Sequence, residues 1–278
     1  MNSAGDQVTV VVPLYTSALP EEERAALAWN VRVLSQHPLT IVCPESLDLT
    51  PLKDVLAPVR PSVEHFPEAC FDGVAGYNRM MLSGQFYDRF AHFRHILVCQ
   101  TDAFVFKDAL HDWCARNYDY IGAPWISSER NALNRAFFRF NNLFRRKKKH
   151  ADYLFKVGNG GFSLRKVRTM QRIVHEQRES IEQLLANPSD NDHHIEDRYF
   201  SLVAPTKLAD MRIPDYHEAV AFCMDRRPQL AMRMNGGALP FACHGFNKKN
   251  VKGFWKPIIE RELRRGSDDG APPVRQAS

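Results

Sequence analysis

Residues 95–106 read HILVCQTDAFVF, and this stretch decides how the 278-residue chain is interpreted. The continuous apolar run His95–Cys99 predicts a buried strand. Three polar residues, Gln100, Thr101 and Asp102, follow it directly. In open α/β sheets, ligands collect beyond the carboxyl ends of the strands, so Asp102 is the first candidate for a functional residue. The alternative is an aspartate that caps a helix or forms a turn.

Strands and helices alternate on both sides of this stretch. Apolar and β-branched runs predict further strands at Val8–Leu14, Leu39–Pro44, Ser62–Phe66, Ala103–Phe106, Tyr118–Gly122, within Val157–Arg165 and at Lys207–Ile213. Helical spacing predicts helices from Pro20 up to His37 and at Val74–Phe90, Ala109–Arg116, Lys166–Leu185, Ile195–Val203 and Lys256–Arg265. Such alternation is typical of an α/β protein whose mainly parallel sheet is flanked by helices.

The chain shows no internal repeat and no clean linker. We therefore expect a single domain over residues 8–265, with a basic insert at 126–156 and a disordered tail at 266–278. Hydrophobic residues make up 44% of the chain and charged residues 25%, as in ordinary globular proteins. No apolar run is long enough for a spanning helix, and the polar start does not resemble a signal peptide. These features predict a cytoplasmic protein.

The cysteines stand singly, with no Cys-x-x-Cys pair to indicate zinc or redox chemistry, so reduced thiols are expected. Charge is less evenly spread. Eight basic residues and no acid lie between Arg130 and Lys149, and without these eight the formal net charge of +5 becomes −3. Phenylalanines interleave with the charges, which favours an anionic membrane surface as partner of Arg130–Lys149. An acceptor-site loop is the alternative, and nucleic acid is not expected.

The segment VGNGGFSLR, residues 157–165, is the second candidate. Its glycines, among them Gly160 and Gly161, allow a ligand to approach the backbone closely, and Asn159 and Ser163 supply polar groups. A tight turn leading into a strand would use the same residues.

The segment DNDHHIEDRYF, residues 190–200, crowds two histidines and four acids into one helix start. Glu196 and Asp197 are adjacent, so on a helix they point about 100° apart and cannot both face one atom. One of them can act as a general base while the other caps or pairs. His193 and His194 are either metal ligands or residues of a solvated loop.

His244, in the segment Cys243–Gly245, is the fourth candidate. It can complete a metal or phosphate site, or it can be a buried structural histidine. Lys248, Lys249 and Lys252 follow closely and would suit phosphate charge or an exposed loop.

Five segments occur in a characteristic order: QTDAFVF, YDYIGAPW, VGNGGFSLR, IEDRYF and CHGFNK. Together they resemble the GT-A glycosyltransferases, and within these a mostly uncharacterised bacterial family found with surface-polysaccharide genes. The likeness covers about Val8 to Trp255, and a similar layout occurs in the inverting β-galactosyltransferases. It implies a Rossmann-like GT-A domain that transfers a hexose from a nucleotide sugar to a hydroxyl of a surface glycan or lipid-linked acceptor. If a base acts directly in line, the anomeric configuration inverts, and a retaining enzyme with a different arrangement is the alternative. Such an enzyme would be cytoplasmic, or peripheral on the inner membrane face.

The resemblance also implies roles for individual residues. Asp102 would bind Mn²⁺ or Mg²⁺ and the donor diphosphate together with His244, although Gln100 stands where the family motif has a second acid. Asp197, rather than Glu196, would be the catalytic base. The remaining donor-binding residues implied are Pro13 and Tyr15 near the nucleotide base, and Thr101, Asn159, Gly160, Gly161 and Lys248.

Other function classes remain open. A sugar-phosphate nucleotidyltransferase also uses an α/β sheet with acidic metal ligands, but the chain has no glycine-rich phosphate loop with a lysine near its start. A metal-dependent hydrolase would use His193, His194 and the two acids that follow. A basic lipid- or nucleic-acid-binding module is the non-enzymatic alternative.

Overall fold

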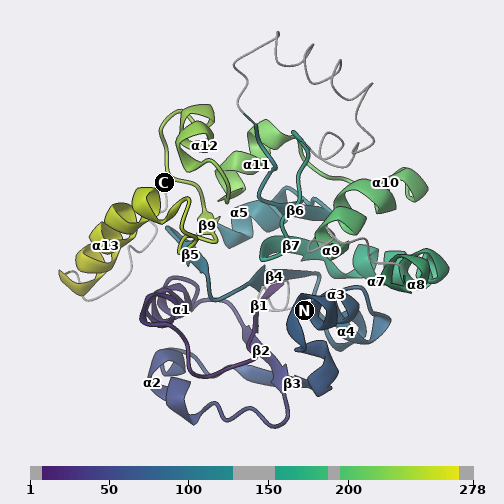
Figure 1. Ribbon diagram of the computed structural model, residues 1–278, viewed down its shortest axis with the longest axis horizontal. Helices are drawn as coiled ribbons and strands as arrows, with labels where there is room; N and C mark the ends of the chain where they lie inside the picture. The colour runs from purple at the N-terminus through teal and green to yellow at the C-terminus, as the bar shows by residue number, and fades with distance from the viewer. Residues whose placement is uncertain (1–7, 128–153, 187–194, 269–278) are drawn as a thin grey trace, which may run out of the picture.

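The computed structural model describes residues 8–127, 154–186 and 195–268. A six-stranded sheet lies at its centre, in the order β3-β2-β1-β4-β7-β6 (Figure 1). Its strands are β1 (Val8–Pro13), β2 (Leu39–Pro44), β3 (Ser62–Phe66), β4 (His95–Cys99), β6 (Tyr120–Gly122) and β7 (Phe162–Lys166). The strands β1 to β4 run parallel, whereas β7 is antiparallel to both β4 and β6. The predicted α/β fold with a mainly parallel sheet is confirmed.

The strands at the centre of the sheet are buried on both faces, which explains their continuous apolar sequences. Along β1, Val10 and Val12 belong to one hydrophobic core and Val11 to the other. The strand β4 repeats the alternation, since Leu97 faces the first core and Ile96 the second. A parallel sheet with polar residues on one face would show alternating apolar and polar residues instead.

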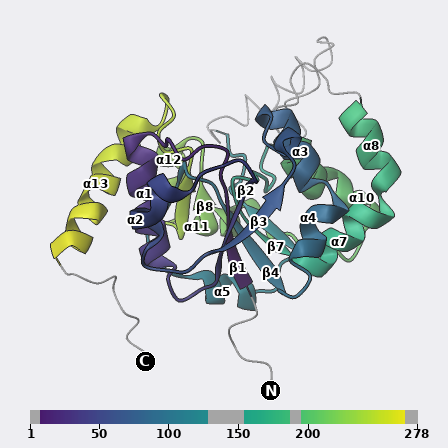
Figure 2. The same ribbon diagram turned by 90° about the horizontal axis from the view of Figure 1, so that it is seen from below.

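Helices cover each face of the sheet. The helices are α1 (Glu21–Val33), α2 (Lys53–Leu56), α3 (Gly73–Met81), α4 (Gly84–Arg89), α5 (Leu110–Ala115), α7 (Val167–Glu176), α8 (Arg178–Ala186), α9 (Ile195–Arg198), α10 (Ala204–Lys207), α11 (Tyr216–Phe222), α12 (Pro228–Met234) and α13 (Lys252–Asp268). Short 3₁₀ turns occur at Thr50–Leu52 and Glu68–Cys70, and a π-helical turn at Tyr199–Val203. In Figure 2, α1, α2 and α13 lie on one side of the sheet and α3, α4 and α7 on the other.

A second sheet continues from the end of β4. It has the order β5-β9-β8, with β5 (Ala103–Val105), β8 (Cys223–Met224) and β9 (Ala242–His244). The pairing of Ala103 with His244 brings a residue from the end of the chain next to the loop that follows β4. This sheet therefore joins two segments that the sequence keeps about half the chain apart.

Two predicted helices are each divided in the structure. The predicted helix 74–90 is α3 followed by α4, because the side chain of Ser83 donates to the Met80 carbonyl and accepts the Phe86 amide. Ser83 thus ends one helix and caps the next. The predicted helix 166–185 is α7 followed by α8, with a junction at Gln177 whose side chain accepts a hydrogen bond from the Tyr199 hydroxyl.

The predicted strand Lys207–Ile213 is wrong. The helix α10 ends at Lys207, and no strand is formed from there to Ile213. Only Arg212 joins the edge of β6, where its amide and carbonyl bond the side chain and the backbone of Asp119. One residue held in this way does not make a ladder, although its apolar neighbours have strand-like sequence.

Three other predictions concern the chain ends and the insert. The helix α13 begins four residues before the predicted helix and ends at Asp268, so it includes the first residues of the predicted tail. Most of the basic insert 126–156 lies outside the described residues, as do His193 and His194. Among the helices of the described residues, none is long and apolar enough to cross a bilayer.

Candidate functional site

A cavity of about 540 Å³ opens where β1 and β4 end and β7 begins. It brings together the residues to which the resemblance gives a role: Pro13, Tyr15, Gln100, Thr101, Asp102, Asn159, Gly160, Gly161, Glu196, Asp197, His244 and Lys248. The antiparallel direction of β7 explains this meeting. Because Cys99 pairs with Phe162, the loop that precedes β7 lies beside the loop that follows β4.

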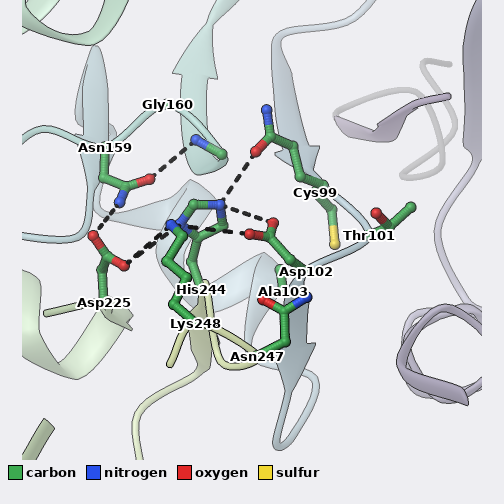
Figure 3. A network of polar contacts seen from close by, with 12 residues as sticks. Cys99, Thr101, Asp102, Ala103, Asn159, Gly160, Asp225, His244, Asn247 and Lys248 are labelled. Carbon is green, nitrogen blue, oxygen red and sulfur yellow. Dashed lines mark hydrogen bonds and ion pairs between the residues drawn. The ribbon is translucent and has the colours of Figure 1, made fainter. Parts of the chain in front are cut away.

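His244, which lines the cavity, is the centre of a cluster of polar contacts (Figure 3). Its Nε2 lies 3.0 Å from Oδ1 of Asp102 and 3.2 Å from Oε1 of Gln100. The imidazole is held there by backbone pairing, since His244 ends β9 and pairs with Ala103. The next amide, of Gly245, donates to the Asp102 carbonyl. The strand-end aspartate and the late histidine therefore form one unit.

Asp225 completes this cluster, although it was not predicted from the sequence. Its Oδ2 accepts a hydrogen bond of 2.7 Å from Nδ2 of Asn159, and its Oδ1 lies 3.8 Å from Nδ1 of His244. Asp225 directly follows the buried strand β8, Cys223–Met224. An acid after a short apolar run is the same signal that pointed to Asp102, but two residues are too few to be noticed as a strand.

The cluster also determines the ionisation of Asp102. Burial by itself raises the pKa of the Asp102 carboxyl, but the charge and hydrogen bond of His244, with the charge of Lys248, outweigh it and lower the pKa to about 2. Asp102 is therefore a carboxylate at neutral pH.

Glycine is required at positions 160 and 161 of the VGNGGFSLR segment, because other side chains lie very close to the backbone there. A Cβ atom on Gly161 would overlap Nε2 of His244, and one on Gly160 would overlap Oε1 of Glu196. Asn159 itself adopts a left-handed conformation, with φ of 61°, and its Oδ1 accepts the Gly161 amide. The loop thus lies directly between the histidine cluster and the acid pair, Glu196 and Asp197.

The two acids of the pair have different surroundings. Glu196 forms an ion pair with the fully buried Arg165, whose Nη2 lies 3.1 Å from Oε2. Arg165 also donates to Ser163 of its own strand and to the hydroxyl of Tyr87 in α4, so several partners fix its guanidinium group. Asp197 lines the same cavity, and burial together with the neighbouring Glu196 charge raises its pKa well above the ordinary value of 3.8.

Further residues that the sequence analysis missed shape the rim. Glu23 of α1 accepts hydrogen bonds from Thr101 at 2.5 Å and from Asn247 at 2.8 Å, so it ties the loops after β4 and β9 together. Phe71 and Tyr77 contribute aromatic surface on the side of α3. Tyr15, predicted near the nucleotide base, is 71% exposed at the mouth of the cavity.

The donor set does not complete the predicted Mn²⁺ or Mg²⁺ site. Asp102 and His244 converge as predicted, but Gln100 offers only a neutral amide oxygen, and Asp225 faces the opposite ring nitrogen of His244. Hard divalent cations favour several carboxylate oxygens. Among residues 8–127, 154–186 and 195–268, no group of three His, Cys, Asp or Glu side chains is arranged to hold a metal ion.

Comparison with solved structures finds glycosyltransferases. Galactosyltransferase LgtC, in complex with donor and acceptor sugar analogues, is 11% identical, and the match covers 96% of this chain and 98% of that one with a TM-score of 0.53. An active-site mutant of LgtC gives 12% identity, the same coverage and a TM-score of 0.53. Core-mannan synthase A (CmsA/Ktr4) from Aspergillus fumigatus, in its Mn/GDP form, is 12% identical over 67% of this chain and 66% of that one, with a TM-score of 0.42.

At these identities the likeness to LgtC shows the fold, so the GT-A fold implied by the sequence motifs is confirmed. A search of curated proteins finds no match. Residues 60–244 match a family profile described as "Protein of unknown function (DUF5672)". The matched segment contains the strand-end aspartate, the glycine-rich loop, the acid pair and the late histidine. Since the profile covers more than half of the chain, the protein belongs to the DUF5672 family.

Proposed function

We propose that the protein is a glycosyltransferase that moves a hexose from a nucleotide-sugar donor to a hydroxyl group of an acceptor. One observation carries the proposal. The cluster of Asp102, His244 and Lys248 and the acid pair lie on either side of the Gly160–Gly161 backbone in a single cavity. The first group suits a diphosphate, and the second suits a hydroxyl that must lose a proton.

The chemistry of transfer matches these two groups. The bond between the anomeric carbon and the diphosphate oxygen breaks, and its electron pair stays on the leaving oxygen. Hydrogen-bond donors and positive charge at that oxygen, from His244 and Lys248, stabilise the developing negative charge. The glycine backbone admits the sugar between the two groups.

The acceptor hydroxyl attacks the anomeric carbon while its proton passes to a carboxylate. We assign this role to Asp197, because it lines the cavity and burial raises its pKa, whereas Glu196 is held in a buried ion pair with Arg165. A raised pKa makes a carboxylate a stronger base near neutral pH. Attack from the face opposite the leaving diphosphate inverts the anomeric configuration, so an inverting mechanism is part of the proposal.

The acceptor is proposed from the sequence alone. A surface glycan or a polyprenyl-type lipid-linked sugar at the inner membrane face would suit the basic and aromatic segment Arg130–Lys149, which lies outside the described residues. A role in bacterial polysaccharide synthesis in the cytoplasm is proposed on the same ground.

A panel of nucleotide sugars tests the function. We expect one or a few donors to release nucleoside diphosphate when incubated with the protein, and Asp102→Asn to abolish the release while the protein stays folded. The reaction should be run both in EDTA and with Mn²⁺. Release of pyrophosphate from a nucleoside triphosphate and a sugar phosphate would instead indicate a nucleotidyltransferase. No consumption of any nucleotide sugar under either condition would contradict the proposal.

A further inference from the structure

Lys248 occupies a distinctive place in the cavity. Its Nζ lies 3.8 Å from Oδ1 of Asp225 and 4.0 Å from Oδ2 of Asp102 (Figure 3). The chain turns sharply before it, because Gly245 has a φ of 63° and the Lys248 amide bonds the Gly245 carbonyl. The side chain then folds back over Gly245, where a Cβ atom would collide with it. The ammonium group therefore lies near two carboxylates that follow different strands, Asp102 after β4 and Asp225 after β8.

The two carboxylates are less accessible than the lysine. The side chain of Asp225 is 7% exposed and that of Asp102 is 21% exposed, whereas that of Lys248 is 50% exposed. The two acids thus lie deeper in the protein than the ammonium group, which remains accessible from the cavity. A phosphate oxygen that enters the cavity can reach it without breaking both ion pairs.

The charge of the cavity makes such a group necessary. Its lining contains the acids Glu23, Asp102, Glu196, Asp197 and Asp225. The basic residues of the lining are Lys248, Arg226 and His244, and Arg165 is fully buried against Glu196. A donor diphosphate carries negative charge, so it binds here only if a cation neutralises the acids around it.

We infer that Lys248 is the resident cation of this site, held by Asp102 and Asp225, and that it binds the donor diphosphate without a divalent metal ion. The inference rests on the proposed function and deepens it. The position between the two acids, where a metal would gain the most from their charge, is taken by the ammonium. A divalent ion there would have to displace Lys248 and would repel it.

Asp225 is the positioning residue in this arrangement. One of its oxygens is fixed by Asn159 of the glycine-rich loop, and the other faces both Lys248 and the buried Nδ1 of His244. Among the described residues, that ring nitrogen has no hydrogen-bond partner. Asp225 therefore sets the place of the lysine ammonium relative to the histidine that contacts Asp102.

Calorimetry with nucleoside diphosphates tests the inference. UDP and GDP are titrated into the full chain in EDTA and again with Mn²⁺, beside the donor panel described above. We expect the preferred diphosphate to bind in EDTA with an affinity close to that in Mn²⁺. Lys248→Met should weaken binding in EDTA by about tenfold to a hundredfold, the amount that a charge-assisted hydrogen bond contributes. Lys248→Arg keeps the positive charge and should retain most of the affinity in EDTA.

Lys249→Met is the matched control, because Lys249 is the exposed neighbour and does not line the cavity. It removes the same charge and should leave the affinity unchanged. Equal affinities of Lys248→Met and Lys249→Met in EDTA would overturn the inference. Binding by the wild-type chain only when Mn²⁺ is present would also overturn it, while the proposed function stands. Absence of nucleotide binding and of turnover under both conditions would instead overturn the proposed function.

Discussion

Nη2 of Arg165 lies 3.1 Å from Oε2 of Glu196, and these side chains are 0% and 5% exposed. The guanidinium is held by Ser163 and Tyr87 as well, so the ion pair is fixed inside the protein beneath the cavity. The adjacent acids therefore have different surroundings. Glu196 anchors the start of α9 on β7, and Asp197, which lines the cavity, is the acid that we propose as the base. The sequence indicated that the two acids differ in role, but it did not show that Glu196 pairs with Arg165.

Glu196→Gln is expected to destabilise the protein. Removing one partner of a buried ion pair leaves an uncompensated charge on Arg165, which costs about 3 to 5 kcal/mol in comparable cases. The free energy of unfolding from urea denaturation measures this. Glu182→Gln is the control, because it removes the carboxylate of the exposed Arg178–Glu182 pair and should change stability little. A loss no larger than that of the control would show that Arg165 does not depend on Glu196.

Asp197→Asn is expected to abolish transfer and to leave donor binding intact. Loss of a general base typically slows the chemical step by about 10² to 10⁴. Calorimetry with the donor and single-turnover assays separate the two effects. A variant that turns over normally would remove the base from the proposed mechanism.

The pH dependence of stability provides a second test of Asp197. Its pKa in the folded protein is raised, chiefly by burial, so the folded chain keeps a proton that the unfolded chain has lost. The stabilisation is complete below the ordinary pKa of 3.8 and is lost as pH rises through the raised pKa. The asparagine of Asp197→Asn does not titrate, so the variant does not lose stability in this way as pH rises. Its melting temperature should therefore gain on that of the wild type as pH rises, and parallel curves would contradict the pKa shift.

The rate of sugar transfer should rise with pH, whereas the stability that Asp197 contributes falls. Asp197 accepts a proton only after it has lost its own, so kcat should rise with pH through its raised pKa. An acid limb at the ordinary pKa of 3.8 would mean that another group is the base.

Gly161→Ala is expected to weaken diphosphate binding by displacing His244. The added methyl group would overlap Nε2 of His244 and approach Oε1 of Gln100, so the imidazole must leave Asp102. Overpacking of this kind costs about 1 to 3 kcal/mol of stability. Gly253→Ala in α13 is the control, since a Cβ atom there meets nothing within 4 Å and alanine favours a helix. Unchanged diphosphate affinity in Gly161→Ala would show that His244 does not need its present position.

Replacement of Arg145–Lys149 with glutamine tests the predicted membrane contact, in a segment outside the described residues. We expect weaker binding to vesicles that contain anionic lipid, because each basic side chain near such a surface contributes about 1 kcal/mol. Activity on a short soluble acceptor should survive. Replacement of Arg261, Arg264 and Arg265 in α13 is the charge control. Loss of soluble-acceptor activity together with vesicle binding would indicate an acceptor site instead.

Most strands and helices, and most residues of the candidate site, could be predicted from the amino-acid sequence. Buried strands need continuous apolar runs, so β1, β2 and β4 can be recognised in the sequence. The end of the run in β4 also indicates that the polar residues after it lie at the edge of the sheet. Glycines next to Asn159 indicated close approach, because only a missing Cβ permits it. Such local features can be predicted because they depend on residues that are consecutive in the sequence.

Which of these residues lie next to one another depends on the tertiary fold. The antiparallel direction of β7, the pairing of Ala103 with His244 and the burial of Arg165 depend on strand order and register, which consecutive residues do not encode. Asp225 could not be predicted as a site residue, because its place also depends on strand order. It follows a strand of two residues, and its importance comes from Asn159, His244 and Lys248, which the fold brings to it from distant parts of the chain.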